Sequence, residues 1–114
     1  DLSRWNMPDV RNMNNMFCNC THFNNGNKPL SWKTTKELRT MNSMFKSATS
    51  FNQQLSFDTS NVHLMVSMFE NCTNFNNGGK PLKLNTQEVT DMARMFKMAK
   101  NFNNGGQPLK LNTQ

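Results

Sequence analysis

The fold of this chain is decided by one stretch, Val62–Phe75, which reads VHLMVSMFENCTNF. It contains an aliphatic residue, Met three positions on, Met-Phe three positions after that, a small residue, and a closing Phe. The same skeleton begins again at Val10, Leu38 and Val89, which makes four copies in 114 residues. Self-similarity at a fixed period of about 20–50 residues is the sequence signature of repeat architectures. The chain is therefore predicted to be a repeat protein.

The spacing of the apolar residues within each copy is typical of a helix. They fall at positions 0, 3, 6, 7 and 10 counted from the first aliphatic residue. At about 100° per residue these positions share an arc of roughly 120°, the core stripe of an amphipathic helix. The spacing predicts helices of about three turns over residues 10–20, 38–48, 62–72 and 89–99. Asp58-Thr59-Ser60, just before Val62, supplies residues of the kind that cap a helix N-terminus.

The predicted core is the set of inward-facing residues that recur in every copy. Its members are Val10, Met13, Met16, Phe17, Phe23, Leu38, Met41, Met44, Phe45, Phe51, Val62, Met65, Met68, Phe69, Phe75, Val89, Met92, Met95, Phe96 and Phe102.

A turn and a short extended segment follow each predicted helix. Three of the turns contain Asn and Gly, which tolerate a positive φ. Apolar-polar-apolar triplets come next, at residues 30–32, 55–57, 82–84 and 109–111, and each predicts a short strand with one buried face. The Asn after each closing Phe is expected to form a ladder that bonds neighbouring turns. These residues are Asn24, Asn52, Asn76 and Asn103.

Together these elements predict an α/β solenoid that is leucine-rich-repeat-like. Each rung would hold a short parallel strand and a three-turn helix, and about four rungs would stack with right-handed connections. The expected rungs are residues 2–29, 30–54, 55–81 and 82–108, with a partial rung at 109–114. We expect one solenoid segment that is part of a longer repeat array.

Composition and charge exclude several classes of protein. The net charge is +6, with 13 Lys and Arg against 7 Asp and Glu, and the two signs are interleaved rather than gathered in a tail. Three cysteines, an odd number without paired spacing, do not predict a disulfide framework. No apolar run is long enough to span a membrane, so we expect no direct membrane insertion of this segment.

No residues are predicted to be catalytic, cofactor-binding or metal-binding. The Met-x-x-Met pairs could offer soft sulfur to Cu(I), but the same positions belong to the apolar stripe, which favours the core. His22 and His63 occupy different repeat positions and have no predicted catalytic partner. Nucleic acid is not an expected partner, because the repeated Phe residues face inward. The candidate surface contacts are Arg11, Arg39, His63, Leu64 and Val66.

The repeat resembles that of the BspA-like surface proteins, a leucine-rich-repeat-like family also seen in mycoplasma lipoproteins and some giant-virus proteins. The resemblance is carried by residues 57–62 (FDTSNV), Met65, Met68-Phe69 and Phe75-Asn76. It implies a non-enzymatic module of a surface-displayed protein that mediates macromolecular binding or adhesion. The partner would be a protein, either from a host, the chain itself or a neighbouring subunit, at an extracellular or cell-surface location. The alternative is a structural scaffold or coat component, for example in a virus particle or filament, that packs through its solenoid faces and ends.

Overall fold

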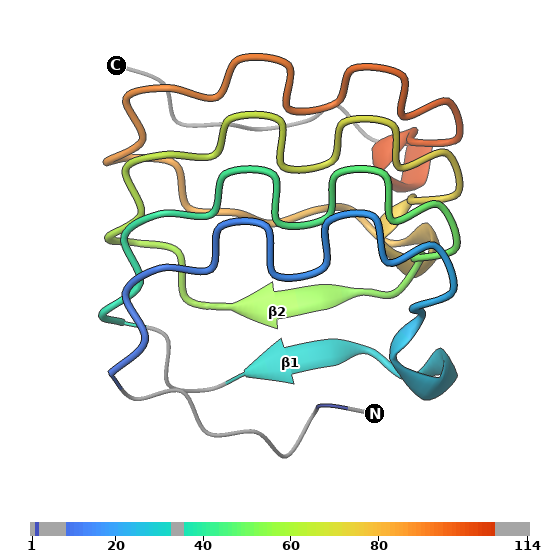
Figure 1. The fold of residues 1–114 in the computed structure, drawn as a ribbon, viewed down its shortest axis with the longest axis horizontal. Helices are drawn as coiled ribbons and strands as arrows, with labels where there is room; N and C mark the ends of the chain where they lie inside the picture. The colour runs from blue at the N-terminus through green and yellow to red at the C-terminus, as the bar shows by residue number, and fades with distance from the viewer. Residues whose placement is uncertain (1, 3–8, 33–35, 107–114) are drawn as a thin grey trace.

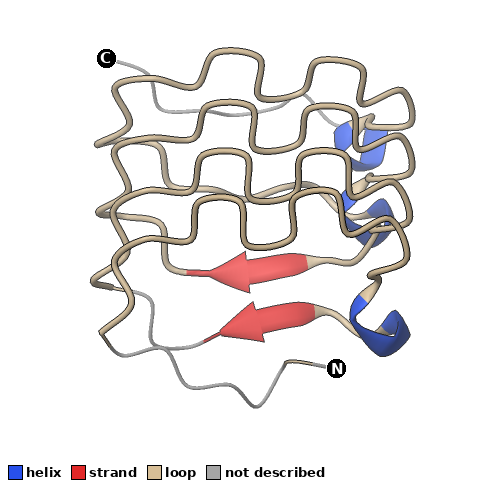
Figure 2. Cartoon of the chain, viewed as in Figure 1, coloured by secondary structure: helices blue, strands red, loops and turns tan. Residues whose placement is uncertain are grey.

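The computed structural model describes residues 2, 9–32 and 36–106. Its elements are the strands β1 (Leu30–Trp32) and β2 (Leu55–Phe57) and three single 3₁₀ turns, η1 (Asn25–Asn27), η2 (Asn77–Gly79) and η3 (Asn104–Gly106). Most of the described chain is loop and turn, yet successive loops lie in register above one another (Figures 1 and 2). Among the described residues no helix is long and apolar enough to cross a membrane.

The predicted helices are wrong, and with them the α/β solenoid class. Residues 10–20, 38–48, 62–72 and 89–99 hold no α-helix and instead run as square-wave traces, which we call the first to fourth zigzag segments (Figure 1). In the first segment, Asn15 has φ 60° and Asn19 has φ 62°. A residue in this left-handed region cannot continue a right-handed helix. The other segments have a positive φ at the same two repeat positions: Ser43, Ser47, Ser67, Asn71, Arg94 and Met98.

The main-chain hydrogen bonds of the zigzag segments run mostly between segments. The amide of Met13 donates to the carbonyl of Thr40 (2.9 Å), and that of Phe17 donates to Met44 (2.8 Å). The amide of Phe45 in turn donates to Met68 (2.9 Å). Because buried backbone groups need partners, each segment depends on its neighbour for the bonds that a helix would make internally.

The zigzag explains why its sequence resembles that of a helix. A positive φ recurs four residues apart, so the trace reverses with a period of four. Side chains three, four and seven residues apart then share the inner face, which is also the spacing of a helical stripe. In the third segment Met65, Met68, Phe69 and Cys72 are all buried. The inward arc is therefore the same in both interpretations, while the backbone differs.

The predicted strands are confirmed for β1 and β2, which pair in parallel with Leu30 opposite Leu55. The third prediction, residues 82–84, is wrong, because this segment is not a strand, although its two leucines are buried and Lys83 is exposed. Beyond β2 the hydroxyl of Thr59 donates to the carbonyl of Asn85 and accepts from its amide, both at 2.9 Å. The fourth triplet, 109–111, lies outside the described residues.

Two columns of stacked rings form the centre of the core. Phe17, Phe45, Phe69 and Phe96 follow one another with centroids 5.4–5.6 Å apart. Phe23, Phe51, Phe75 and Phe102 form the second column at 5.6–5.9 Å. Most of the residues predicted as core are buried. Those that are half-buried lie in the first and last copies, and they are Val10, Met16, Phe23, Met92, Phe96 and Phe102.

The predicted asparagine ladder is confirmed. The side-chain oxygens of Asn24, Asn52 and Asn76 each accept the amide of the next ladder residue, at 2.8, 2.7 and 2.7 Å. A second set of asparagines, which sequence reasoning missed, is buried: Asn25, Asn77 and Asn104. The side-chain oxygen of Asn77, for example, accepts the amide of Leu55 at 2.8 Å. Side-chain amides thus join the turns to one another and to the start of β2.

Candidate binding surface

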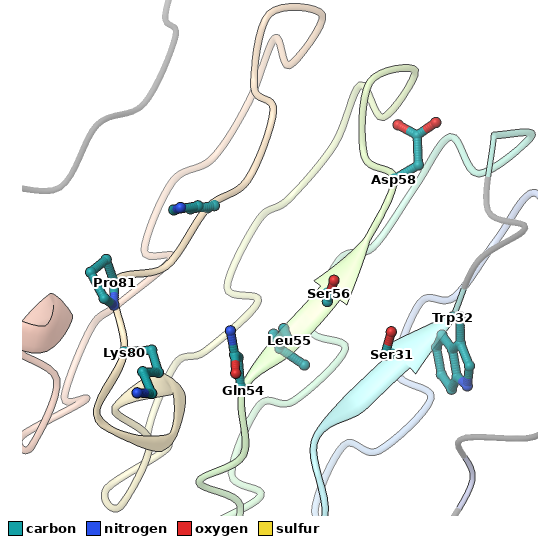
Figure 3. Close-up of a pocket in the computed structure, with 9 residues that line it drawn as sticks. Ser31, Trp32, Gln54, Leu55, Ser56, Asp58, Lys80 and Pro81 are labelled. Atoms are coloured by element: carbon teal, nitrogen blue, oxygen red, sulfur yellow. The ribbon is translucent and has the colours of Figure 1, made fainter.

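An open groove of about 560 Å³ lies over the strands and the neighbouring segment (Figure 3). It is lined by Ser31, Trp32, Gln54, Leu55, Ser56, Asp58, Lys80, Pro81 and Lys83. Ser31 and Ser56 come from β1 and β2, and Lys80 and Pro81 come from the turn that follows η2. The groove therefore lies where strand pairing stops after β2.

The rim of the groove is fixed by the turn at η2. The side-chain nitrogen of Asn77 donates to the carbonyls of Lys80 (3.2 Å) and Pro81 (3.0 Å). Gly78 has φ 62°, and a Cβ there would lie 3.1 Å from the backbone nitrogen of Gln54. Both the left-handed backbone and this close approach favour glycine. The lysine and proline at the rim are thus carried by a well-anchored turn.

The groove is polar and carries charges of both signs. A side-chain hydrogen bond with Ser60 and a backbone hydrogen bond from its amide lower the pKa of Asp58. Its carboxylate is therefore ionised at neutral pH. Lys80 and Lys83 are exposed. Trp32 is buried, and its indole nitrogen donates to the carbonyl of Leu2 at 3.0 Å, so it supports the wall rather than offering an open aromatic surface.

The predicted surface contacts lie on the zigzag face. Arg11 and His63 are exposed, and Arg39 is half-buried. The structure brings the three into one column, because Arg39 N–H donates to the Arg11 carbonyl (2.9 Å) and His63 N–H to the Arg39 carbonyl (2.7 Å). Leu64 and Val66, the other two, are both half-buried. Backbone hydrogen bonds therefore hold these side chains in one row. The Nη2 of Arg39 also lies 3.6 Å from the Oε2 of Glu37.

A second column on this face holds charges that sequence reasoning missed. Lys46, Glu70 and Lys97 share one repeat position, and a shared position was the signal that could have found them. The hydroxyl of Ser67 lowers the pKa of Glu70 by hydrogen bonding, and the positive charges of Lys46, Lys97 and Arg94 lower it further, while desolvation opposes them. Alternating charge in this column favours the stacking of segments.

The sulfur atoms lie largely inside the stack. Met41, Met44, Met65 and Met68 have no exposed surface, so their thioethers are packed as core. Cys72 is also buried, and burial raises the pKa of its thiol to about 12. No group of three His, Cys, Asp or Glu side chains in the described part of the chain is placed to hold a metal ion.

The two histidines occupy different repeat positions. His22 is exposed. The Nδ1 of His63 lies 3.2 Å from the carbonyl of Glu88, a main-chain atom. What the described surface offers is a polar groove and side-chain columns with a fixed spacing.

The chain belongs to the family described as "Mycoplasma protein of unknown function, DUF285", whose model matches residues 1–109. No curated protein and no solved structure shows a significant match to the chain.

Proposed function

We propose that this chain is a non-enzymatic binding module of a surface-displayed protein, and that it contacts a partner protein through the groove over β1 and β2. The observation that carries the proposal is the division between inner and outer positions. From one repeat to the next, the inner positions of the backbone keep Met and Phe, whereas the residue at an outer position changes. One outer column, for example, reads Arg11, Arg39, His63 and Thr90. A rigid scaffold with variable exposed residues is typical of binding surfaces.

The groove is the strongest candidate contact because it combines concavity, fixed backbone and mixed charge. Its Ser hydroxyls and Lys ammonium groups can donate hydrogen bonds, and the ionised Asp58 can accept them. Such a groove suits a polar or acidic stretch of a folded partner or an extended peptide. The resemblance of the repeat to BspA-like surface proteins supports an extracellular or cell-surface location and an adhesive role.

The test measures binding of the fluorescently labelled chain to intact epithelial cells by flow cytometry, with and without mild protease treatment of the cells. We expect saturable binding that protease removes and that Lys80→Glu/Lys83→Glu weakens at least several-fold. The matched control is Lys28→Glu/Lys100→Glu, which makes the same charge change at exposed residues outside the groove. Absence of saturable binding, or equal losses in both variants, would contradict the proposed contact.

A second candidate function is a structural scaffold or coat component, for example in a virus particle or filament. It is favoured by one observation: the zigzag segments bond to one another in a repeated register of main-chain hydrogen bonds. Exposed main-chain donors and acceptors offer a template for further pairing. In that role the chain would pack against copies or neighbours, and its assemblies would be visible by electron microscopy as ordered stacks. Dispersed single particles at high concentration would count against it.

A further inference from the structure

The sheet does not continue beyond β2, because a side chain takes the place of a main-chain bond there. At the β1–β2 interface the amide of Leu30 donates directly to the carbonyl of Gln54 (2.9 Å). The equivalent bond one repeat later would join Leu55 to Pro81. Instead the side-chain oxygen of Asn77 accepts the amide of Leu55 (2.8 Å), and its nitrogen donates to the carbonyl of Pro81 (3.0 Å). A side-chain amide thus lies between two backbones that would otherwise pair.

A second side chain bridges the same two segments at the other end of β2. The hydroxyl of Thr59 donates to the carbonyl of Asn85 and accepts from its amide, both at 2.9 Å. Between the two bridges, no main-chain hydrogen bond joins β2 to residues 82–84 within the described part of the chain. Main-chain donors and acceptors need partners, so those at this level of the groove are suited to a polar ligand.

The outer face of these segments presents hydroxyl and ammonium groups in one row. Ser31 lies opposite Ser56 in the paired strands (Figure 3). Lys83 is the middle residue of the next triplet, and the leucines on either side of it are buried. Because successive side chains of an extended segment point to opposite faces, all three side chains point outward. The row offers hydrogen-bond donors from three successive repeats.

The charges of the groove are not balanced within it. Lys80 and Lys83 are exposed, and among the described residues no carboxylate lies within ion-pair distance of either. Both come from the segment after η2, whereas the one acidic residue among those that line the groove, Asp58, follows β2. A carboxylate that entered beside Ser56 would therefore receive charge-assisted hydrogen bonds from the two lysines. The groove is complementary to an anionic ligand.

The lining favours a peptide over a sugar. Trp32 is buried, and its indole nitrogen donates to the carbonyl of Leu2, so its ring is not an open surface on which a sugar could stack. An extended peptide rises about 3.3 Å per residue, so about four residues span the distance along β2 from Gln54 to Asp58, which both line the groove. A peptide also brings a main-chain donor and acceptor at nearly every residue.

We propose that the groove binds an extended acidic segment of a partner protein, about four residues long, with its carboxylates at Lys80 and Lys83 and its main chain along β2. This inference rests on the proposed function, because it names the chemistry of the partner at the same groove. The contact involves β1, β2 and residues 80–83 only, so it requires no other repeat.

The first test selects ligands from a library of random short peptides displayed on phage, with the immobilised parent chain as the target. Capped synthetic copies of the selected peptides are measured by fluorescence anisotropy. We expect sequences rich in Asp and Glu, whose affinity Lys80→Glu/Lys83→Glu lowers at least about tenfold. The control Lys28→Glu/Lys100→Glu should leave the affinity nearly unchanged. Recovery of no peptides, or of peptides without acidic residues, would overturn the proposal.

The second test reverses the charges on both sides of the contact. Peptides in which Lys replaces each acidic residue should not bind the parent but should bind Lys80→Glu/Lys83→Glu. Both lysines are exposed, so this variant keeps the packing of the core. Binding of the reversed peptide also shows that the variant is folded. If the reversed peptide bound neither chain, the lysines would not be the contact and the proposal would fail.

The third test distinguishes a bound main chain from a bound anion. Methylation of one main-chain nitrogen at a time removes a donor of the peptide and keeps its carboxylates, and we expect at least one such peptide to bind about fivefold more weakly. Equal affinities throughout, or tighter binding of a sulfated oligosaccharide with the same lysine dependence, would overturn the peptide assignment. Cell binding without peptide binding would refute this inference alone, whereas peptide binding without cell binding would contradict only the proposed function.

Discussion

Met98 offers a sensitive probe of the zigzag backbone, because its side chain is 55% exposed and its φ is 61°. A substitution there changes the backbone preference and removes little packing. In the zigzag, Met98→Gly should stabilise the protein, because glycine adopts a positive φ without the steric cost that a Cβ brings. In the helix that the apolar spacing predicts, the same change should destabilise it.

The magnitude follows from two opposing terms. A non-glycine residue in the left-handed region costs roughly 1–2 kcal/mol, and glycine relieves this cost. The greater freedom of glycine in the unfolded chain offsets about 0.4–1 kcal/mol of the gain. The net change is a stabilisation of roughly 0.5–1 kcal/mol, or a rise in Tm of about 2–4 °C for a domain of this size. Within a helix, glycine would instead lower the stability by about 1 kcal/mol.

The assay is thermal and urea unfolding of the parent, Met98→Gly and Met98→Asn. Asparagine is included because Asn19 and Asn71 occupy the same repeat position with φ 62° and 58°, and it should also stabilise. Lys97→Gly is the matched control, because Lys97 does not have a positive φ and should lose stability. If Met98→Gly and Lys97→Gly destabilised the protein equally, the left-handed backbone at Met98 would be refuted.

Three further changes test the core and the titrating groups. Phe69→Ala should cost about 3–5 kcal/mol and clearly more than Phe96→Ala, since Phe69 is buried and Phe96 half-buried; equal losses in urea denaturation would argue against the stacked columns. Cys72 should resist alkylation at about pH 8 until the protein unfolds, because burial raises the pKa of its thiol to about 12; rapid labelling of Cys72 in the folded chain would show that the site is open. The lowered pKa of Asp58 gives stability that is present above its ordinary value of 3.8 and is lost as the pH falls through the lower folded-state value. Asp58→Asn should therefore reduce the loss of Tm between about pH 6 and pH 2, and an unchanged profile would exclude this contribution.

The sequence predicts the repeat, its inner face and part of its sheet, but not the path of the backbone. Met68 and Phe69 lie inside in either a helix or a zigzag, because the intervals of three, four and seven residues are common to both. The distinguishing signal is the residue at the two reversal positions. Asn15 and Asn19 favour a positive φ and are weak helix formers. Met98 has a positive φ at the repeat position of Asn19, but methionine does not indicate it in the sequence.

The groove could not be predicted, because it arises from a difference between repeats. The next Leu comes four positions after Phe51 but seven positions after Phe75. The longer link contains Asn77, which is buried and fixes the carbonyls of Lys80 and Pro81. A pattern averaged over the repeats shows the strand that they share but not the longer link of one repeat. The shape of that link depends on the carbonyls to which the side chain of Asn77 donates.

The feature that defines this fold is backbone pairing between zigzag segments in place of α-helical pairing within them. It is tested most directly by NMR scalar couplings across hydrogen bonds, which identify the carbonyl that accepts each amide. The structure predicts a coupling between the amide nitrogen of Phe45 and the carbonyl carbon of Met68, whose oxygen lies 2.9 Å from that nitrogen. A coupling from Phe45 to the carbonyl of Met41, four residues earlier as in an α-helix, would contradict the account.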